Sequence, residues 1–97
     1  MADYLVSYDV ETTTRGGRRR LRRVAKACED FGQRVQLSVF ECRLDDTVFE
    51  TFLERVTAEI DGQADSLRIY RLPAGRTMAV RVLGRDTWRD PDAPLVF

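Results

Sequence analysis

Two segments with helical spacing of apolar residues lie between strand-like segments of this 97-residue chain, and this alternation limits the fold more than any other feature. Residues 3 to 10 alternate between large apolar side chains and smaller or polar ones, which predicts a strand. On this alternation, Asp9 lies on the opposite face from Val6 and Tyr8. The chain length suits a single domain that spans residues 1–97.

The two helical segments differ in how clearly their ends are marked. Gly16 and Gly17 indicate a break before the first segment, and its apolar residues recur up to Gly32, which predicts a helix over residues 18–31. In the second segment Thr47 and Glu50 have capping-box spacing, and the helix is expected to end near Gly62. Its apolar face comprises Val48, Phe49, Phe52, Leu53, Val56 and Ile60.

The remaining strand-like segments determine the topology. Residues 33–44 are long for one strand, so they form either one bent strand or two strands around a turn near residues 37–38. Residues 67–72 and 78–83 are expected to form strands, with Pro73-Ala74-Gly75 as the turn between them. The hairpin alternative gives an α+β, ferredoxin-like βαββαβ fold with an additional C-terminal strand, in which one antiparallel sheet carries two helices on one face.

The second face of that sheet would lack a cover from the predicted elements. Because exposed apolar sheet faces are usually covered by another molecule or segment, we expect a homodimer in which a second copy supplies the cover. The apolar end of the chain, Leu95-Val96-Phe97, belongs to a C-terminal segment, residues 84–97, that we expect to pack on the dimer partner.

Composition excludes several classes of function. The chain contains no histidine, which excludes histidine metal ligands, imidazole bases and Ser-His or Cys-His nucleophile pairs. Neither a secretion signal nor a run of about 18 apolar residues is present, so we expect a cytoplasmic protein. Cys28 and Cys42 fit neither a CxxC metal pattern nor a disulfide-rich scaffold, and we expect reduced, partly buried thiols.

Charge is unevenly placed although the net charge is zero. From Thr12 through Cys28 there is no acidic residue, and cations at a helix start are unfavourable unless an anion binds them. A nucleic-acid phosphate is the expected anion, and the alternative is a solvated basic face that aids solubility. The basic residues of this segment are Arg15, Arg18, Arg19, Arg20, Arg22, Arg23 and Lys26.

Asp9 is the candidate metal ligand, because it ends a mostly apolar strand just before the basic segment. Taken alone it could be a simple turn or cap residue. One carboxylate with waters and substrate phosphates can hold Mg²⁺ or Mn²⁺, and a twofold dimer would bring two copies of Asp9 together. The bound ion would then suit phosphodiester chemistry in a chain without histidine.

Three further residues have two interpretations each. Phe40 is either a core residue or an interface or base-stacking residue, and Arg34 is either a surface strand residue or a functional one. Trp88 is expected to pack under the C-terminal tail or against a partner.

Three segments carry a family resemblance: Tyr4-Leu-Val-Ser-Tyr-Asp9-Val, Arg23-Val-Ala-Lys26 and Gly32-Gln-Arg34-Val-Gln36-Leu-Ser38-Val-Phe40-Glu41-Cys42. On these, and over about residues 3 to 83, the chain resembles the small CRISPR-associated nuclease, the second of the two near-universal spacer-acquisition proteins. The resemblance implies a ferredoxin-like homodimer that hydrolyses RNA or DNA phosphodiester bonds with a divalent ion on Asp9. It also implies catalytic roles for Arg34 and Phe40.

The same resemblance bears on topology and partners. It implies strands near residues 33–36 and 39–44, a C-terminal segment that pairs with the other subunit, and helix-start arginines at Arg20 and Arg22. It further implies that the dimer bridges two dimers of the CRISPR integrase on protospacer DNA. Three functions follow as hypotheses: a metal-dependent endonuclease, a non-catalytic DNA-binding scaffold of the integrase complex, and a stand-alone ribonuclease toxin of related fold.

Overall fold

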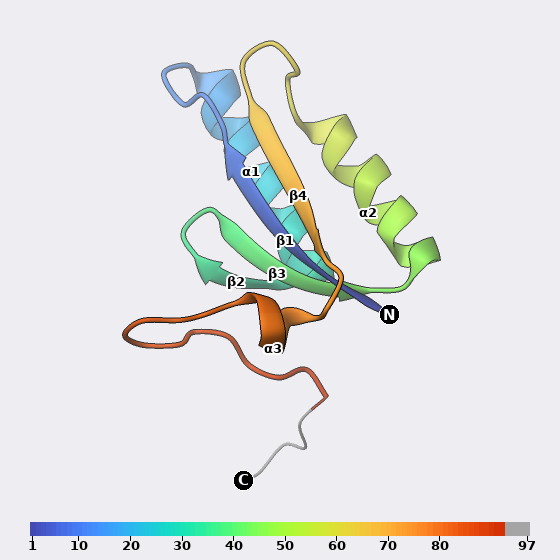
Figure 1. Cartoon of the computed structure of the whole chain (residues 1–97). Helices are drawn as coiled ribbons and strands as arrows, with labels where there is room; N and C mark the ends of the chain where they lie inside the picture. Colours follow the sequence, from blue (N-terminus) through green and yellow to red (C-terminus); the bar gives the residue numbers. More distant parts are fainter. Residues whose placement is uncertain (93–97) are drawn as a thin grey trace, which may run out of the picture.

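A four-stranded antiparallel sheet with strand order β2-β3-β1-β4 forms the centre of the molecule (Figure 1). The computed structural model describes residues 1–92. The strands are β1 (Ala2–Asp9), β2 (Gln33–Gln36), β3 (Val39–Leu44) and β4 (Ser66–Leu72). The helices α1 (Arg15–Phe31) and α2 (Asp46–Glu59) cover one face, which confirms the ferredoxin-like βαββαβ arrangement.

The core lies between this sheet face and the two helices. Strand alternation places the apolar residues of β1 and β3 toward the helices, as predicted for β1. Phe52 of α2 has no exposed surface and packs against Phe31 with ring centroids 5.3 Å apart. The buried residues of this core are Tyr4, Val6, Tyr8, Val10, Val24, Ala27, Cys28, Phe40, Cys42, Leu44, Phe52 and Val56.

Helix α1 begins one turn earlier than predicted. Thr14 caps it by accepting a hydrogen bond from the backbone N–H of Gly17 at 2.9 Å, so the two glycines lie inside the first turn. Gly17 is required there by a close approach, because a Cβ atom would lie 1.8 Å from the backbone oxygen of Glu11. The glycine pair therefore permits packing of the helix start against the preceding loop, and our interpretation of it as a break was wrong.

The predicted capping box of α2 was also wrong. Asp45 is the N-cap and accepts a hydrogen bond from the backbone N–H of Val48 at 2.8 Å. Thr47 therefore lies within the first turn, because the carboxylate two residues earlier already satisfies this helix start. The helix ends at Glu59, slightly before the expected end near Gly62.

The hairpin alternative for residues 33–44 is confirmed. β2 and β3 pair as antiparallel neighbours on either side of the turn at residues 37–38. The register shifts between Arg34 and Gln36, which indicates a bulge in β2. Leu37 at the turn is 86 % exposed.

The additional strand predicted at residues 78–83 is not formed. After the turn at residues 73–74, Gly75 adopts a positive φ of 83° and the one-turn helix α3 (Arg76–Ala79) follows. The Asp3 carboxylate accepts the backbone N–H of Arg76 at 2.9 Å, which turns the chain away from the sheet edge. Without an adjacent strand edge, residues 80–83 have no ladder partner in the described part of the chain.

The segment after α3 crosses the sheet face that the two long helices leave open (Figure 1). The Thr87 hydroxyl donates to the Val35 carbonyl at 2.5 Å, and the Arg89 backbone N–H donates to the Gln33 side chain at 2.8 Å. The chain thus covers part of this face itself, where we had expected only a second copy. Residues 84–92 contact their own sheet, and packing of this segment on a partner stays a prediction, while Leu95-Val96-Phe97 lies outside the described residues. No helix within residues 1–92 is long and apolar enough to cross a bilayer.

Candidate functional site

Asp9 is the last residue of β1 and its side chain is exposed. Within residues 1–92, no cationic side chain lies within ion-pair distance of its carboxylate. Sequence reasoning left open whether Asp9 is a turn or cap residue, and no hydrogen bond of that kind involves it in the described chain. Its oxygens are therefore available to a ligand.

A hollow of about 370 Å³ lies beside this carboxylate, between the end of β1, the middle of α1 and the β2–β3 turn. We call it the Asp9 hollow. It brings together three predicted site residues from distant parts of the sequence, namely Asp9, Arg22 and Arg34. Its lining residues are Tyr8, Asp9, Val10, Leu21, Arg22, Ala25, Arg34, Leu37 and Ser38.

Arg34 lies on the exposed edge strand β2, and its side chain is positioned by two neighbours. Its guanidinium carbon lies 5.2 Å from the centroid of the Phe40 ring, and one of its nitrogens lies 3.4 Å from the Glu29 carboxylate. Phe40 has no exposed surface, which confirms the core interpretation and makes the base-stacking one wrong. In this arrangement the Phe40 ring supports the Arg34 guanidinium from inside the core.

Tyr8 is a lining residue that the sequence analysis did not select. Strand alternation assigned it to the core, and it is indeed almost fully buried with its ring stacked 6.1 Å from that of Phe40. Burial raises the pKa of the Tyr8 phenol, and the positive charge of Arg34 opposes this rise. The phenol is therefore a neutral hydrogen-bonding group at the wall of the hollow. Its position directly before Asp9 is the only sequence signal for this role.

The helix-start arginines divide into groups with different surroundings. Arg20 donates to the Asp65 carboxylate through Nε at 2.8 Å and through a second nitrogen at 3.3 Å. Asp65 has no exposed side-chain surface and also accepts the backbone N–H groups of Asp61 and Glu11. These hydrogen bonds, led by that from Arg20, lower the pKa of Asp65 to about 2. Arg20 thus holds the fold together, which the sequence did not reveal because Asp65 lies 45 residues away.

Other predicted arginines remain accessible. Arg18 donates to the backbone oxygen of Thr12 at 3.2 Å, while Arg15 has no ion pair within residues 1–92. A second hollow of about 350 Å³, which we call the basic hollow, lies between α1 and α2. It is lined by Arg19, Arg22, Arg23, Lys26, Arg55 and Glu59.

Charge in the basic hollow is only partly neutralised. Lys26 and Arg55 both pair with Asp30, at 2.8 Å in each case. In the described chain, Arg19 and Arg23 have no acidic partner within ion-pair distance. An anion of another molecule can therefore bind here, as expected for a phosphate backbone.

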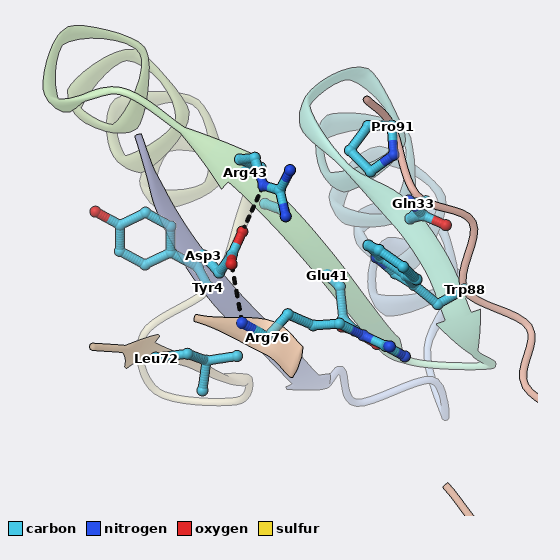
Figure 2. A pocket seen from close by; sticks show the side chains of 10 residues that line it. Asp3, Tyr4, Gln33, Glu41, Arg43, Leu72, Arg76, Trp88 and Pro91 are labelled. Carbon is cyan, nitrogen blue, oxygen red and sulfur yellow. Dashed lines mark hydrogen bonds and ion pairs between the residues drawn. The ribbon is translucent and has the colours of Figure 1, made fainter. Parts of the chain in front are cut away.

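A polar network on the opposite sheet face anchors the C-terminal segment (Figure 2). The Arg76 guanidinium donates to the Glu41 carboxylate at 2.8 Å, and both side chains are nearly buried, with 12 % and 8 % exposed. The Trp88 ring lies 4.1 Å from the Arg76 guanidinium carbon, so it packs against its own chain, and contact with a partner stays a prediction. The cavity among these residues measures only about 20 Å³, so it is too small for a ligand.

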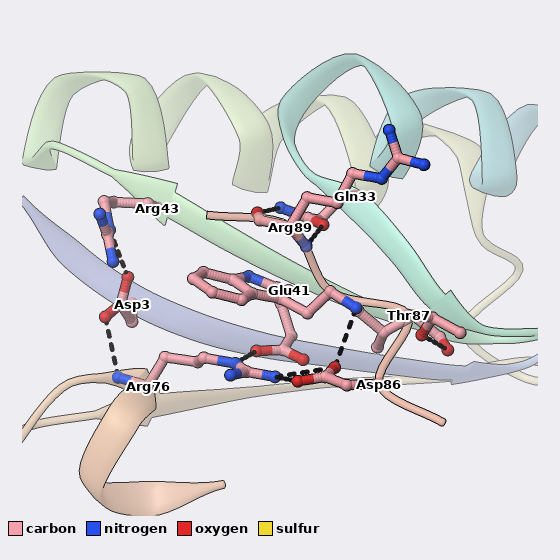
Figure 3. A network of polar contacts seen from close by, with 10 residues as sticks. Asp3, Gln33, Glu41, Arg43, Arg76, Asp86, Thr87 and Arg89 are labelled. Atoms are coloured by element: carbon pink, nitrogen blue, oxygen red, sulfur yellow. Dashed lines mark hydrogen bonds and ion pairs between the residues drawn. The ribbon is translucent and has the colours of Figure 1, made fainter. Parts of the chain in front are cut away.

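The same network extends to both ends of the segment (Figure 3). Asp86 accepts from Arg76 at 3.3 Å, and Asp3 accepts from Arg43 at 2.9 Å. Arg43 also pairs with Asp92. These contacts join residues far apart in the sequence and are structural, and no sequence pattern indicated them.

The residues of one chain supply only part of the ligand set that a divalent ion needs. Within residues 1–92, no three His, Cys, Asp or Glu side chains come together. A single carboxylate such as Asp9 suits Mg²⁺, which keeps several waters and takes substrate phosphates as ligands. Cys28 and Cys42 are free and buried, and burial raises the pKa values of their thiols to about 11 and about 12.

Comparisons with known proteins show which family this chain resembles. The family model for CRISPR associated protein Cas2 matches residues 1–79. The chain is 49% identical over 93 residues to the CRISPR-associated endoribonuclease Cas2 1 of Moorella thermoacetica, covering 96% of this chain and 97% of that protein. It is 47% identical to the CRISPR-associated endonuclease Cas2 of Halalkalibacterium halodurans, with the same coverage.

The fold is shared with a solved relative. The crystal structure of Streptococcus pyogenes Cas2 matches with a TM-score of 0.74 and 49% sequence identity, covering 84% of this chain and 99% of that one. The family match includes β1 with Asp9, the arginines of α1 and the β2–β3 hairpin. This chain therefore belongs to the Cas2 family of CRISPR-associated proteins.

Proposed function

We propose that this chain is a divalent-metal-dependent endonuclease that hydrolyses phosphodiester bonds of RNA or DNA at the Asp9 hollow. The observation that carries the proposal is the exposed carboxylate of Asp9, which has no ion pair within residues 1–92 and lies beside Arg22 and Arg34 in one hollow. The names of the relatives, endoribonuclease and endonuclease, support the same class of reaction.

The residues of the hollow have distinct tasks in this reaction. Asp9 would hold Mg²⁺ or Mn²⁺, which supplies Lewis-acid stabilisation of charge on the phosphodiester. Arg34, fixed against the Phe40 ring, and Arg22 bind phosphate oxygens and orient the strand. The open side of the site is completed by substrate phosphates and, in a homodimer, by the Asp9 of a second copy.

Replacement of Asp9 tests the proposal directly. With Mg²⁺, the Asp9→Asn variant should cleave single-stranded RNA and duplex DNA at least about 100-fold more slowly, because a metal contributes several kcal/mol to transition-state stabilisation. Removal of divalent ions with a chelator should have the same effect on the native protein. The matched control is Glu54→Gln, which changes an exposed carboxylate on α2. Cleavage by Asp9→Asn at the native rate would contradict the assignment.

The second candidate function is a non-catalytic scaffold that positions protospacer DNA for CRISPR integrase dimers in the cytoplasm. The basic hollow favours it, because Arg19 and Arg23 have no acidic partner within the described residues and so present positive charge on the helix layer. If the Asp9→Asn variant supports spacer integration at the native level, the scaffold is the role that matters in the cell. Membership of the Cas2 family favours both roles over a stand-alone ribonuclease toxin.

A further inference from the structure

The Asp9 hollow has an apolar wall that phosphodiester hydrolysis does not require. Leu21 and Ala25 of α1 form part of this wall, together with Val10 after β1 and Leu37 of the β2–β3 turn. Metal and phosphate binding need only oxygen atoms and cations. The wall therefore indicates contact with an apolar part of a ligand.

Leu37 is the strongest single sign of such a contact. Tight turns usually carry polar residues, glycine or proline, yet this position holds a leucine that is 86 % exposed. Its side chain contributes little to the core, so fold stability does not explain it. It is a lining residue of the hollow, where it can contact a flat ring that enters.

The rim of the hollow complements the charge of a nucleotide. Arg22 and Arg34 supply positive charge for phosphates, while Ser38 and the neutral Tyr8 phenol supply hydrogen-bonding groups. A nucleobase has apolar faces and a polar edge, and it is always flanked by phosphates in a strand. The volume of about 370 Å³ lies at the lower end of the range for small-ligand sites, which suits one base.

We propose that the Asp9 hollow binds one unpaired nucleobase of a single-stranded nucleic acid, next to the phosphate that faces Asp9. This inference rests on the proposed function, and it names Leu21, Ala25 and Leu37 as the residues that contact the base. A paired base can enter only after it leaves the duplex, so the site favours single strands.

Binding measurements without divalent ions test this proposal independently of cleavage. The probes are a short single-stranded RNA and a strand of the same length that lacks its bases. The native chain should bind the abasic strand more weakly by on the order of tenfold, because contact of a base with the aliphatic wall removes apolar surface from water. Ala25→Leu narrows the hollow without adding an aromatic ring on which a base could stack, and it should bring the ratio of the two affinities close to one.

Leu37→Ser is a second variant, for the case in which the larger side chain at position 25 disturbs folding. Position 37 is an exposed turn position outside the core, so its substitution should leave the fold intact. Leu37→Ser should also lower the ratio of the affinity for the RNA strand to the affinity for the abasic strand. The control Leu53→Ser, at an exposed leucine of α2, should leave this ratio at the native value. An unchanged ratio in both hollow variants, or equal binding of both probes by the native chain, would overturn the inference. Base-dependent binding that disappears in both hollow variants supports the inference of a base-binding site. This result would stand even if the native chain cleaves no nucleic acid and the proposed nuclease function is wrong.

Discussion

Two aspartates at the same end of the sheet, Asp9 and Asp65, have opposite surroundings. Asp9 ends β1 opposite Ser66, the residue that follows Asp65. Asp9 is exposed without an ion pair in the described chain, whereas the buried Asp65 accepts the Arg20 guanidinium and two backbone N–H groups. The comparison shows that a carboxylate whose oxygens are already hydrogen-bonded stabilises the fold, and that a free carboxylate nearby is available to a ligand.

The largest expected effect on the fold comes from Asp65→Ala. This change leaves the N–H groups of Glu11 and Asp61 without their acceptor and removes the charge-assisted bonds from Arg20, so the free energy of unfolding should fall by about 2 kcal/mol. Urea unfolding measures this loss. Asp9→Asn should change stability by less than about 0.5 kcal/mol, as is usual at exposed positions. Equal losses in the two variants would remove the distinction between the aspartates.

A smaller effect should appear in the pH dependence of stability. The pKa of Asp65 is about 2 in the folded chain, below its ordinary value of 3.8, so the unfolded chain binds a proton first as the pH falls. The stabilisation is therefore complete above about pH 5 and is lost as the pH falls from about 4 toward about 2. Unfolding free energies measured across this range should fall less steeply in Asp65→Asn. A slope unchanged by this substitution would show that other carboxylates cause the loss.

The smallest effect should separate Arg23 from Arg20. Arg23 lines the basic hollow without an acidic partner in the described chain. Arg23→Gln should therefore reduce the slope of the logarithm of the binding constant against the logarithm of the salt concentration by the amount that about one phosphate contact contributes. Arg20→Gln should instead lower stability, because it breaks the bond with Asp65. Binding isotherms at several salt concentrations measure the first effect, and thermal unfolding measures the second. The reverse result would show that both arginines were assigned to the wrong role.

Local patterns predicted most of the fold. The alternation in β1 and the turn at residues 73–75 depend on neighbours within a few positions, and these predictions are confirmed. The apolar face predicted for α2 is confirmed for the buried Phe52 and Val56, but Val48 and Leu53 are exposed. The helix starts were less predictable. Gly17 is explained by the approach of Glu11, and Asp45 caps α2 in place of Thr47, so each boundary depended on a specific contact.

The candidate site was only partly predictable. Asp9 and the basic segment stand out in the sequence, and the structure places Asp9 with Arg22 and Arg34 as lining residues of one hollow. Burial of Phe40 was one of two open interpretations, and only the packed structure decided it. The bond between Arg20 and Asp65 could not be anticipated, because it joins side chains from different elements. The strand predicted at residues 78–83 was wrong for the same reason, since a strand exists only where another strand edge is available.

The sequence by itself determined the order of the main elements, the uneven placement of charge and the absence of imidazole chemistry, because these follow from composition and short-range periodicity. Only the tertiary structure decided which charged groups are free. Arg20 and Asp65 neutralise each other across 45 residues, while Asp9 stays without an ion pair in the described chain. The physical reason is that ion pairs depend on distances in space, which the packing of helices on the sheet sets.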